Sequence, residues 1–236
     1  MFYWVLKNLL LGPLLRLIYR PRARGIENIP RTGGFILAAN HLSFVDSLFM
    51  PLACPRPVVF LGKADYFESW RTRWFFRAVS VIPVRRQGGA AGEAAILAGI
   101  EALKVGRAVG IYPEGTRSPD GRLYRGKTGV ARMALEARVP VIPVSIRGTR
   151  EVMAIDAKVP RMSGKVVVEF GKPLVFDRYH DSPRDRFVLR SVTDEIMYEI
   201  MMLSGQEYVD EYASSVKARR AEPAPSEAPA SASVRR

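Results

Sequence analysis

Short apolar runs alternate along the chain with longer stretches of helical periodicity. The runs are rich in β-branched residues and bounded by glycine, proline or asparagine, which is typical of strands. They read FILAAN (35–40), PVVFLGK (57–63), VIPV (81–84), AVGIY (108–112), VPVIPVSI (139–146) and KVVVEF (165–170). Helices are predicted at residues 44–53, 65–79, 90–105, 127–138 and about 183–203. Near-continuous apolar strands joined by helical crossovers predict an α/β fold, with a mixed, mostly parallel sheet covered by helices.

Residues 1–24 depart from this pattern, because aromatic and leucine residues are mixed there with basic ones. The apolar run is interrupted at Lys7, Asn8, Gly12, Pro13 and Arg16. It is therefore shorter than the roughly 20 consecutive apolar residues that cross a bilayer. We predict two short helices broken at Pro13, lying in the membrane interface with their basic residues towards anionic headgroups. A pair of helices packed into the protein core is the alternative.

The opposite end of the chain changes composition from about residue 214, where alanine, proline, serine and glutamate dominate. Such a segment buries too little apolar surface to offset the entropy lost on ordering, so a disordered tail is predicted for residues 214–236. The expected organisation is thus an interface segment at 1–24, an α/β domain at 25–213 and the tail.

The charge balance narrows the classes of partner. The 236 residues carry 36 basic and 23 acidic side chains, a net charge of +13, which favours nucleic acid, an anionic membrane surface or phosphorylated substrates. The cations are scattered and no nucleic-acid-binding motif accompanies them, so no nucleic-acid partner is expected. A single cysteine, Cys54, excludes a disulfide within the chain.

The stretch NHLSFVD holds one of the two histidines, His41, five positions before Asp46. Ser43 and Asp46 form the pattern S-x-x-D before an apolar run, which predicts a helix start with Ser43 as N-cap and Asp46 at the third helical position. Because the chain turns at the cap, the imidazole of His41 is expected to fold back and reach Asp46, which the helix dipole helps keep ionised. The alternative is a capping box beside a structural histidine.

Two strand ends carry candidate phosphate ligands. The motif YPEGTRS follows the strand AVGIY, and the carboxyl ends of strands are where ligands bind in α/β sheets. Gly115 gives its turn the freedom to point amides at an anion, and Arg117 has the geometry to grip a phosphate. The run SVIPVRR ends a second strand with Arg85 and Arg86. The two arginine-bearing strand ends predict a phosphate pocket.

The stretch GRLYRGKT, Gly121 to Thr128, formally matches a nucleotide phosphate-binding loop. We favour another interpretation, because the stretch does not follow a strand directly and its interior residues are bulky. Measurable nucleotide hydrolysis would support the alternative. Lys127, at the start of the next predicted helix, is expected to support a substrate phosphate instead.

Four of these stretches, in this order and spacing, resemble the motifs of the glycerophospholipid acyltransferase family, most closely the 1-acyl-glycerol-3-phosphate acyltransferases. NHLSFVD matches the family's NHxxxxD motif, YPEGTRS its third motif and VPVIPV its fourth. SVIPVRR resembles the second motif, G-x-I-x-V-D-R, but has Ser80 in place of glycine and Arg85 in place of the acidic residue. The resemblance covers about residues 25–175 and implies the glycerol-3-phosphate acyltransferase-like fold.

The resemblance implies transfer of a fatty acyl group from acyl-CoA or acyl-carrier protein to the hydroxyl of lysophosphatidic acid, giving phosphatidic acid. His41 would be the general base and Asp46 would orient it. The implied substrate-binding residues are Arg86, with Arg85 as a rival, and Glu114, Gly115, Thr116, Arg117 and Lys127. Glu114 would order its turn or contact the acceptor. No metal or cofactor is expected. The expected location is the cytoplasmic face of the cell membrane, with a peripheral or monotopic attachment, and another lysophospholipid or a glycolipid is the alternative acceptor.

Overall fold

The computed structural model describes residues 5–63, 81–84 and 90–221. The helix predicted at residues 65–79 and the candidate ligands Arg85 and Arg86 lie outside this part of the chain. All six apolar runs singled out in the sequence form strands of one sheet. These are β2 (Phe35–Ala39), β3 (Val58–Lys63), β4 (Val81–Val84), β5 (Ala108–Ile111), β7 (Val141–Arg147) and β8 (Val167–Phe170).

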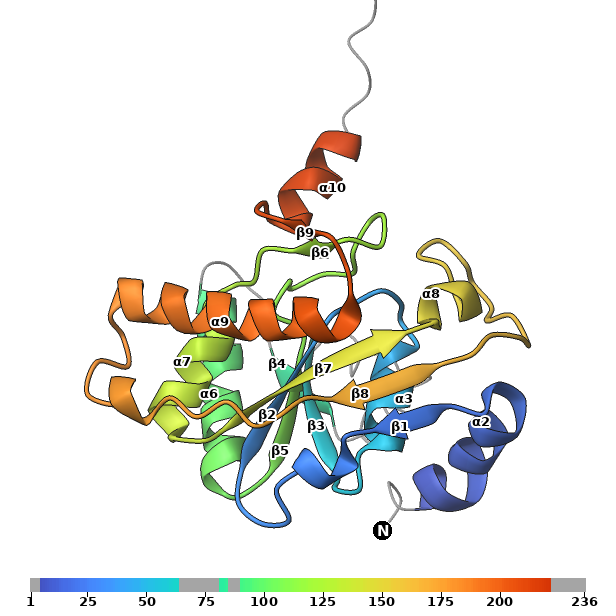
Figure 1. The fold of residues 1–236 in the computed structure, drawn as a ribbon, viewed down its shortest axis with the longest axis horizontal. Helices are drawn as coiled ribbons and strands as arrows, with labels where there is room; N and C mark the ends of the chain where they lie inside the picture. Colours follow the sequence, from blue (N-terminus) through green and yellow to red (C-terminus); the bar gives the residue numbers. More distant parts are fainter. Residues whose placement is uncertain (1–4, 64–80, 85–89, 222–236) are drawn as a thin grey trace, which may run out of the picture.

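The sheet has seven strands in the order β1-β8-β7-β2-β5-β3-β4, where β1 spans Arg22–Arg24 (Figure 1). Every neighbouring pair is parallel except β7 and β8, so the prediction of a mixed, mostly parallel sheet is confirmed. β1 was not predicted, since its three residues are exposed and polar or small. It is the edge strand of the sheet, and its parallel pairing with β8 holds it there.

Helices cover both faces of the sheet (Figure 1). On one face lie α2 (Leu11–Tyr19) and α3 (Asp46–Ala53), and on the other α6 (Ala90–Lys104), α7 (Gly129–Ala137) and α9 (Arg186–Ser204). Side chains of a strand alternate between faces. Phe35, Leu37 and Ala39 of β2 therefore join the core with α2 and α3, while Ile36 and Ala38 join the core with α6, α7 and α9.

Short elements complete the fold. These are the 3-10 turns η2 (Ile26–Asn28) and η3 (Asp177–Tyr179), the helix α8 (Thr149–Val152) and a second, two-stranded sheet of β6 (Leu123–Tyr124) and β9 (Tyr208–Val209). The helix α9 starts three residues later than predicted. Asp185 is its N-cap, and its carboxylate accepts hydrogen bonds from the amides of Phe187 and Val188.

The N-terminal segment is one helical run and not two broken helices. A π-helical turn, η1 (Leu6–Leu10), leads directly into α2, and Pro13 is the third residue of α2. The predicted break at Pro13 is therefore wrong. A π turn widens the helix, and such turns accommodate local disruption of the hydrogen-bond ladder.

The two faces of this helical run have different surroundings. Leu15, Ile18 and Tyr19 pack against the core of the α2 and α3 face. Leu9, Leu14 and Leu17 remain 60%, 52% and 73% exposed. The segment thus combines a core-packed face with a free apolar face. None of the helices in the described residues is long and apolar enough to cross a membrane.

The C-terminal helix α10 (Ala213–Ala221) occupies the start of the segment predicted to be a disordered tail. Buried Ala213 and Val216 pack against the buried ring of Tyr124. The prediction of disorder is therefore wrong for residues 214–221, and residues 222–236 lie outside the described chain. Figure 1 shows α10 above the main sheet, beside the small β6–β9 sheet.

Candidate active site

Strand β2 brings the NHLSFVD stretch to the carboxyl edge of the main sheet. Asn40, the first residue after β2, is buried, and its side chain copies the hydrogen bonding of a strand. Its Nδ2 donates to the carbonyl of Ile146 at 3.0 Å, and its Oδ1 accepts from the Ile146 amide at 2.8 Å. This pairing with β7 fixes the direction in which the chain leaves β2, and so fixes the position of the His41 backbone.

His41 and Asp46 are in direct contact, as the sequence predicted. The imidazole Nδ1 lies 2.8 Å from Asp46 Oδ2. The same carboxylate oxygen accepts hydrogen bonds from the amides of Leu42 at 2.7 Å and Ser43 at 2.8 Å. The backbone of residues 42–43 therefore wraps around the carboxylate and brings the imidazole onto it.

The helix start itself differs from the prediction. The helix α3 begins at Asp46 with Val45 as its N-cap, and the Ser43 hydroxyl donates to the carbonyl of Met153 at 2.7 Å. Ser43 as a side-chain N-cap is therefore wrong. Only the reciprocal half of a capping box is present, in which the Asp46 carboxylate accepts from the Ser43 amide.

The hydrogen bonding assigns the tautomer of His41. A buried carboxylate that already accepts two amide hydrogens is an acceptor for a third, so Nδ1 carries the proton and donates it to Asp46. The lone pair is then on Nε2, which has no hydrogen-bond partner among the described residues. The His41 side chain is 15% exposed. Such an imidazole is able to accept a proton from a bound hydroxyl group.

Tyr112, at the end of β5, fixes the plane of the imidazole. The two rings are stacked, with their centroids 3.8 Å apart and an angle of 10° between their planes. The Tyr112 hydroxyl lies 3.1 Å from the Ser47 hydroxyl. Burial, with the negative charge of Asp46, raises the pKa of Tyr112 well above its usual value, so this residue stays neutral. Sequence reasoning missed Tyr112, although its position directly before the PEGT turn was a usable signal.

The YPEGTRS loop holds the main chain of His41 at both ends. Glu114 Oε1 accepts a hydrogen bond from the His41 amide at 3.0 Å, and the Ser118 amide donates to the His41 carbonyl at 2.7 Å. Glu114 Oε2 accepts from the Tyr124 amide at 3.1 Å. Burial raises the pKa of Glu114 to about 8 despite these two amide donors. Of the two roles predicted for Glu114, these contacts are those of a residue that orders the turn.

Gly115 and Thr116 form the tip of this loop. Gly115 has a φ of 74°, a conformation that favours glycine. Its amide donates to the Tyr112 carbonyl at 2.9 Å, so this N–H closes the turn and is not directed at a ligand. The Thr116 hydroxyl accepts a hydrogen bond from Lys217 Nζ of α10 at 2.9 Å.

Three basic side chains surround the loop. Arg117 donates to the carbonyl of Ile155 at 3.0 Å. The exposed side chain of Lys127 lies over Gly115: a Cβ added to Gly115 would be 3.0–3.2 Å from the last three atoms of the lysine side chain. Lys217 contacts Thr116. The structure thus brings Arg117 and Lys127, both predicted, together with Lys217, which was not. Among the described residues, no group of three or more His, Cys, Asp and Glu is placed to hold a metal ion.

The GRLYRGKT stretch does not form a phosphate-binding loop. Leu123 and Tyr124 are buried and form β6. Four backbone amides of this stretch donate hydrogen bonds within the protein. Leu123 donates to the carbonyl of Glu207, and Tyr124 donates to the carboxyl group of Glu114. Arg125 donates to the carbonyls of residues 209 and 211, and Lys127 donates to the carbonyl of Pro113. These N–H groups are therefore already engaged within the protein, whereas a phosphate-binding loop directs them at its ligand.

Comparison with known proteins places this geometry in a family. The family described as Acyltransferase matches residues 20–147, which include all four motifs. The chain belongs to the acyltransferase family. This acyltransferase is 30% identical over 150 residues to the 1-acyl-sn-glycerol-3-phosphate acyltransferase of Bacillus subtilis, a match that covers 63% of the chain and 70% of its relative.

The chain spans less than half the length of several other relatives. The chloroplastic 1-acyl-sn-glycerol-3-phosphate acyltransferase BAT2 of Brassica napus is 30% identical over 157 residues, which are 66% of this chain but only 45% of that protein. The crystal structure of the 1-acyl-sn-glycerophosphate acyltransferase PlsC from Thermotoga maritima has the same fold, with a TM-score of 0.60 and 24% identity. That likeness covers 93% of this acyltransferase and 83% of PlsC.

Proposed function

We propose that this acyltransferase transfers a fatty acyl group from acyl-CoA or acyl-carrier protein to the free hydroxyl of 1-acyl-glycerol-3-phosphate, which gives phosphatidic acid. The observation that carries the proposal is the 2.8 Å contact between His41 and Asp46, with Nε2 of the imidazole left to accept a proton. The names of the relatives support the choice of acceptor. The alternative acceptors are another lysophospholipid and a glycolipid.

The chemistry follows from the imidazole. As the lipid oxygen attacks the thioester carbonyl carbon, its proton moves to His41 Nε2, and Asp46 stabilises the resulting imidazolium. When the tetrahedral intermediate collapses, the carbon–sulfur bond breaks and the thiolate leaves. The imidazolium then returns its proton to the thiolate. The products are the new ester and a free thiol, and no side-chain nucleophile is acylated.

The phosphate of the acceptor would lie against Arg117 of the YPEGTRS loop and the basic residues around it. Arg117 is half-buried and has no carboxylate ion-pair partner among the described residues, so its charge is available to an anion. A guanidinium is suited to two-point contact with phosphate oxygens. Arg86, with Arg85 as its rival, is the proposed second phosphate ligand, and Lys127 is proposed to support the same charge.

The free apolar face of the helical run formed by η1 and α2 supports attachment to a membrane surface. Leu9, Leu14 and Leu17 are exposed, and Arg16 lies among them in the sequence. Apolar side chains beside a cation are typical of a helix that rests in the interface of an anionic bilayer. We therefore propose a peripheral or monotopic location on the cytoplasmic face of the cell membrane, where a lipid acceptor would be reached without leaving the bilayer.

An acyl-transfer assay with the purified protein tests the proposed function. The acceptors are lysophosphatidate, lysophosphatidylcholine, a monoacylglycerol and a lysoglycolipid, each with acyl-CoA and with acyl-carrier protein. We expect the highest kcat/KM for lysophosphatidate. A higher kcat/KM for another acceptor would replace the substrate but keep the chemistry. No transfer to any of them would contradict the proposal.

A further inference from the structure

The C-terminal helix α10 reaches the loop that holds His41. Lys217 Nζ of α10 donates to the Thr116 hydroxyl at 2.9 Å. Thr116 lies midway between Glu114, which binds the His41 amide, and Ser118, which binds the His41 carbonyl. An ammonium group of α10 is therefore placed on the same short loop that fixes the proposed general base.

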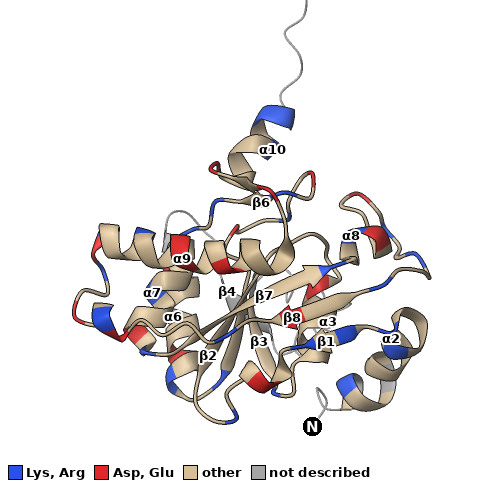
Figure 2. Cartoon of the chain, viewed as in Figure 1, with Lys and Arg blue, Asp and Glu red and all other residues tan. Residues whose placement is uncertain are grey.

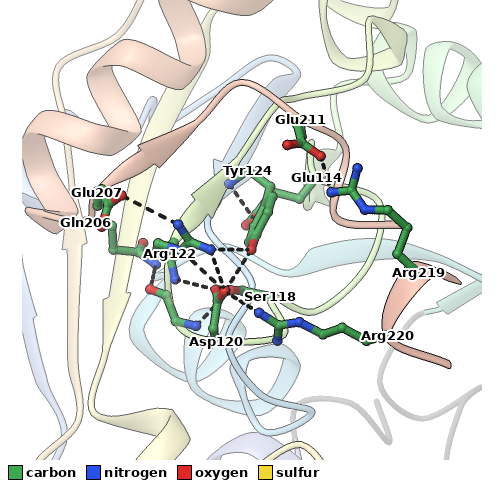
Figure 3. A network of polar contacts seen from close by, with 11 residues as sticks. Glu114, Ser118, Asp120, Arg122, Tyr124, Gln206, Glu207, Glu211, Arg219 and Arg220 are labelled. Atoms are coloured by element: carbon green, nitrogen blue, oxygen red, sulfur yellow. Dashed lines mark hydrogen bonds and ion pairs between the residues drawn. The ribbon is translucent and has the colours of Figure 1, made fainter. Parts of the chain in front are cut away.

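The position of α10 is fixed by contacts around Lys217. Val216 and Ala213 pack against Tyr124. In addition, the Arg220 guanidinium contacts Asp120 Oδ2 at 3.0 Å, and this oxygen also accepts from the Tyr124 hydroxyl at 2.8 Å (Figure 3). Figure 3 shows that this network joins α10 to the loop of residues 118–122 and to Glu114. Along α10, an apolar contact at Val216 and an ion pair at Arg220 thus flank Lys217 and hold its part of the helix in place.

The charges around Lys217 are unbalanced. Burial and the nearby positive charge of Arg117 lower the pKa of Lys217, against the opposing influence of Glu114 and Asp156. Neither Lys217 nor Arg117 forms an ion pair with a carboxylate in the described chain. Glu114 contributes little negative charge at neutral pH, since burial raises its pKa to about 8. Two neighbouring, partly desolvated cations, neither ion-paired with a carboxylate among the described residues, favour an anion near both.

Elsewhere in the chain, three of four clustered arginines have carboxylate partners. A cavity of about 510 Å³ beside α7 and α9 is lined by four arginines, among them Arg132 and Arg190. Arg132 pairs with Glu93 and Glu136, and Arg190 pairs with Asp194. Figure 2 shows acidic and basic residues interspersed over these helices. Within the described residues, Arg117 and Lys217 thus differ from most arginines of this cavity, because neither has such a partner.

We propose that Lys217 is a further acceptor-binding residue, which contacts the phosphate of 1-acyl-glycerol-3-phosphate together with Arg117. The inference rests on the proposed function and deepens it. Lysine binds phosphate as a point charge, and its hydrogen bond to Thr116 holds it at the loop while two further N–H groups remain for the ligand. Lys217 lies outside the matched family residues 20–147, so the C-terminal segment would complete a site that the four motifs only begin.

The test is a comparison of KM for lysophosphatidate among Lys217→Met, Lys217→Arg and Arg219→Met, with the acyl donor saturating. Arg219 is a matched control, because it is a cation of the same helix that pairs with exposed Glu211. We expect Lys217→Met to raise KM about 10- to 100-fold, the range for loss of a charge-assisted hydrogen bond, with kcat within about threefold of wild type. Lys217→Arg should recover most of the affinity, and Arg219→Met should match wild type.

The outcomes separate the inference from the proposed function. If wild type acylates lysophosphatidate but Lys217→Met has an unchanged KM, or a reduced kcat alone, the inference is wrong and the proposed function stands. If wild type does not use lysophosphatidate, both fail. If Lys217→Met does not fold, Lys217→Gln replaces it, because glutamine retains a hydrogen-bond donor for Thr116 but has no charge. The same increase in KM for lysophosphatidate is expected for that variant. The KM for a monoacylglycerol, which has no phosphate, should be the same in wild type and in the variants of Lys217.

Discussion

Two buried carboxyl groups hold His41, and they hold different parts of it. Asp46 contacts the ring, with its Oδ2 on Nδ1, whereas Glu114 contacts the main chain, with its Oε1 on the amide. Both side chains are almost fully buried, and both accept hydrogen bonds from backbone amides. Burial and amide bonding therefore do not distinguish a residue that assists proton transfer from a residue that shapes the turn. The two roles are distinguished by the atom of the histidine that each carboxyl group contacts.

The two carboxyl groups also differ in the way that their two oxygen atoms are hydrogen-bonded. Glu114 uses both oxygens on backbone amides and, with a pKa raised by burial to about 8, is mostly protonated at neutral pH. Asp46 concentrates three donors on Oδ2, and its buried Oδ1 has no hydrogen-bond partner among the described residues. Asp46 is thus placed to stabilise a positive charge on the imidazole, while Glu114 is an uncharged residue that holds backbone amides of the turn.

Removal of the imidazole should have the largest effect. His41→Ala leaves both carboxyl groups in place but removes the base, so we expect kcat to fall by about 10²- to 10⁴-fold. Acyl transfer to lysophosphatidate at saturating substrate measures it. His180→Ala is the control, since His180 is the other histidine and lies 3.7 Å from exposed Asp177. Turnover by His41→Ala close to that of His180→Ala would refute the assignment of the base.

Asp46→Asn should have the next largest effect. The amide oxygen of asparagine can still accept from His41 Nδ1, so the ring stays oriented, but the charge that stabilises the imidazolium is lost. The difference between a charged and a neutral hydrogen bond of this kind predicts a fall in kcat of about 10- to 100-fold. Its amide nitrogen, buried at the position of Oδ1, should also lower Tm.

The matched control for Asp46→Asn is Asp177→Asn, which alters the second His–Asp pair of the chain at an exposed position. We expect that variant to keep the kcat and the Tm of wild type. If Asp46→Asn lowers Tm while kcat remains at the wild-type value, Asp46 holds the fold of the turn and has no part in proton transfer.

The sequence predicted those elements that bury apolar side chains in a regular pattern. The six strands of the main sheet outside β1 were predicted because each is an apolar run between turn residues. β1, β6 and β9 were not, since each is two or three residues long and is held by pairing with a distant strand. The helix α10 was missed because its composition is polar, and its burial depends on Tyr124, which lies about 90 residues earlier.

The site shows the same division between local and distant contacts. The contact of His41 with Asp46 was predicted from a turn of a few residues, and the place of Arg117 in YPEGTRS was predicted from its position after a strand end. The hydroxyl of Ser43 binds Met153, which is 110 positions away, so no local pattern signalled that it would not cap the helix. The stacking of Tyr112 on His41 and the contact of Lys217 with Thr116 likewise join separate segments.

Glu114→Gln should have the smallest effect on turnover and the clearest effect on the pH dependence of stability. The pKa of Glu114 is about 8 in the folded protein, against 4.5 for an ordinary glutamate, so between these values the folded state holds a proton that the unfolded state has released. The contribution of Glu114 to the free energy of unfolding therefore falls as pH rises from about 5 to 8, and Glu114→Gln should lack this contribution.

Thermal unfolding at pH 5, 6.5 and 8 measures the difference in slope between wild type and Glu114→Gln. Glutamine accepts at one oxygen only, so one of the two amides of His41 and Tyr124 loses its partner and kcat should fall, but by less than about tenfold. Glu93→Gln is the control, because its contact with Arg132 lowers the pKa of Glu93 and leaves it ionised in both states over this range. Equal slopes in all three proteins would show that Glu114 is ionised in the fold. Glu114 would then be a second charged partner of His41, and its contrast with Asp46 would disappear.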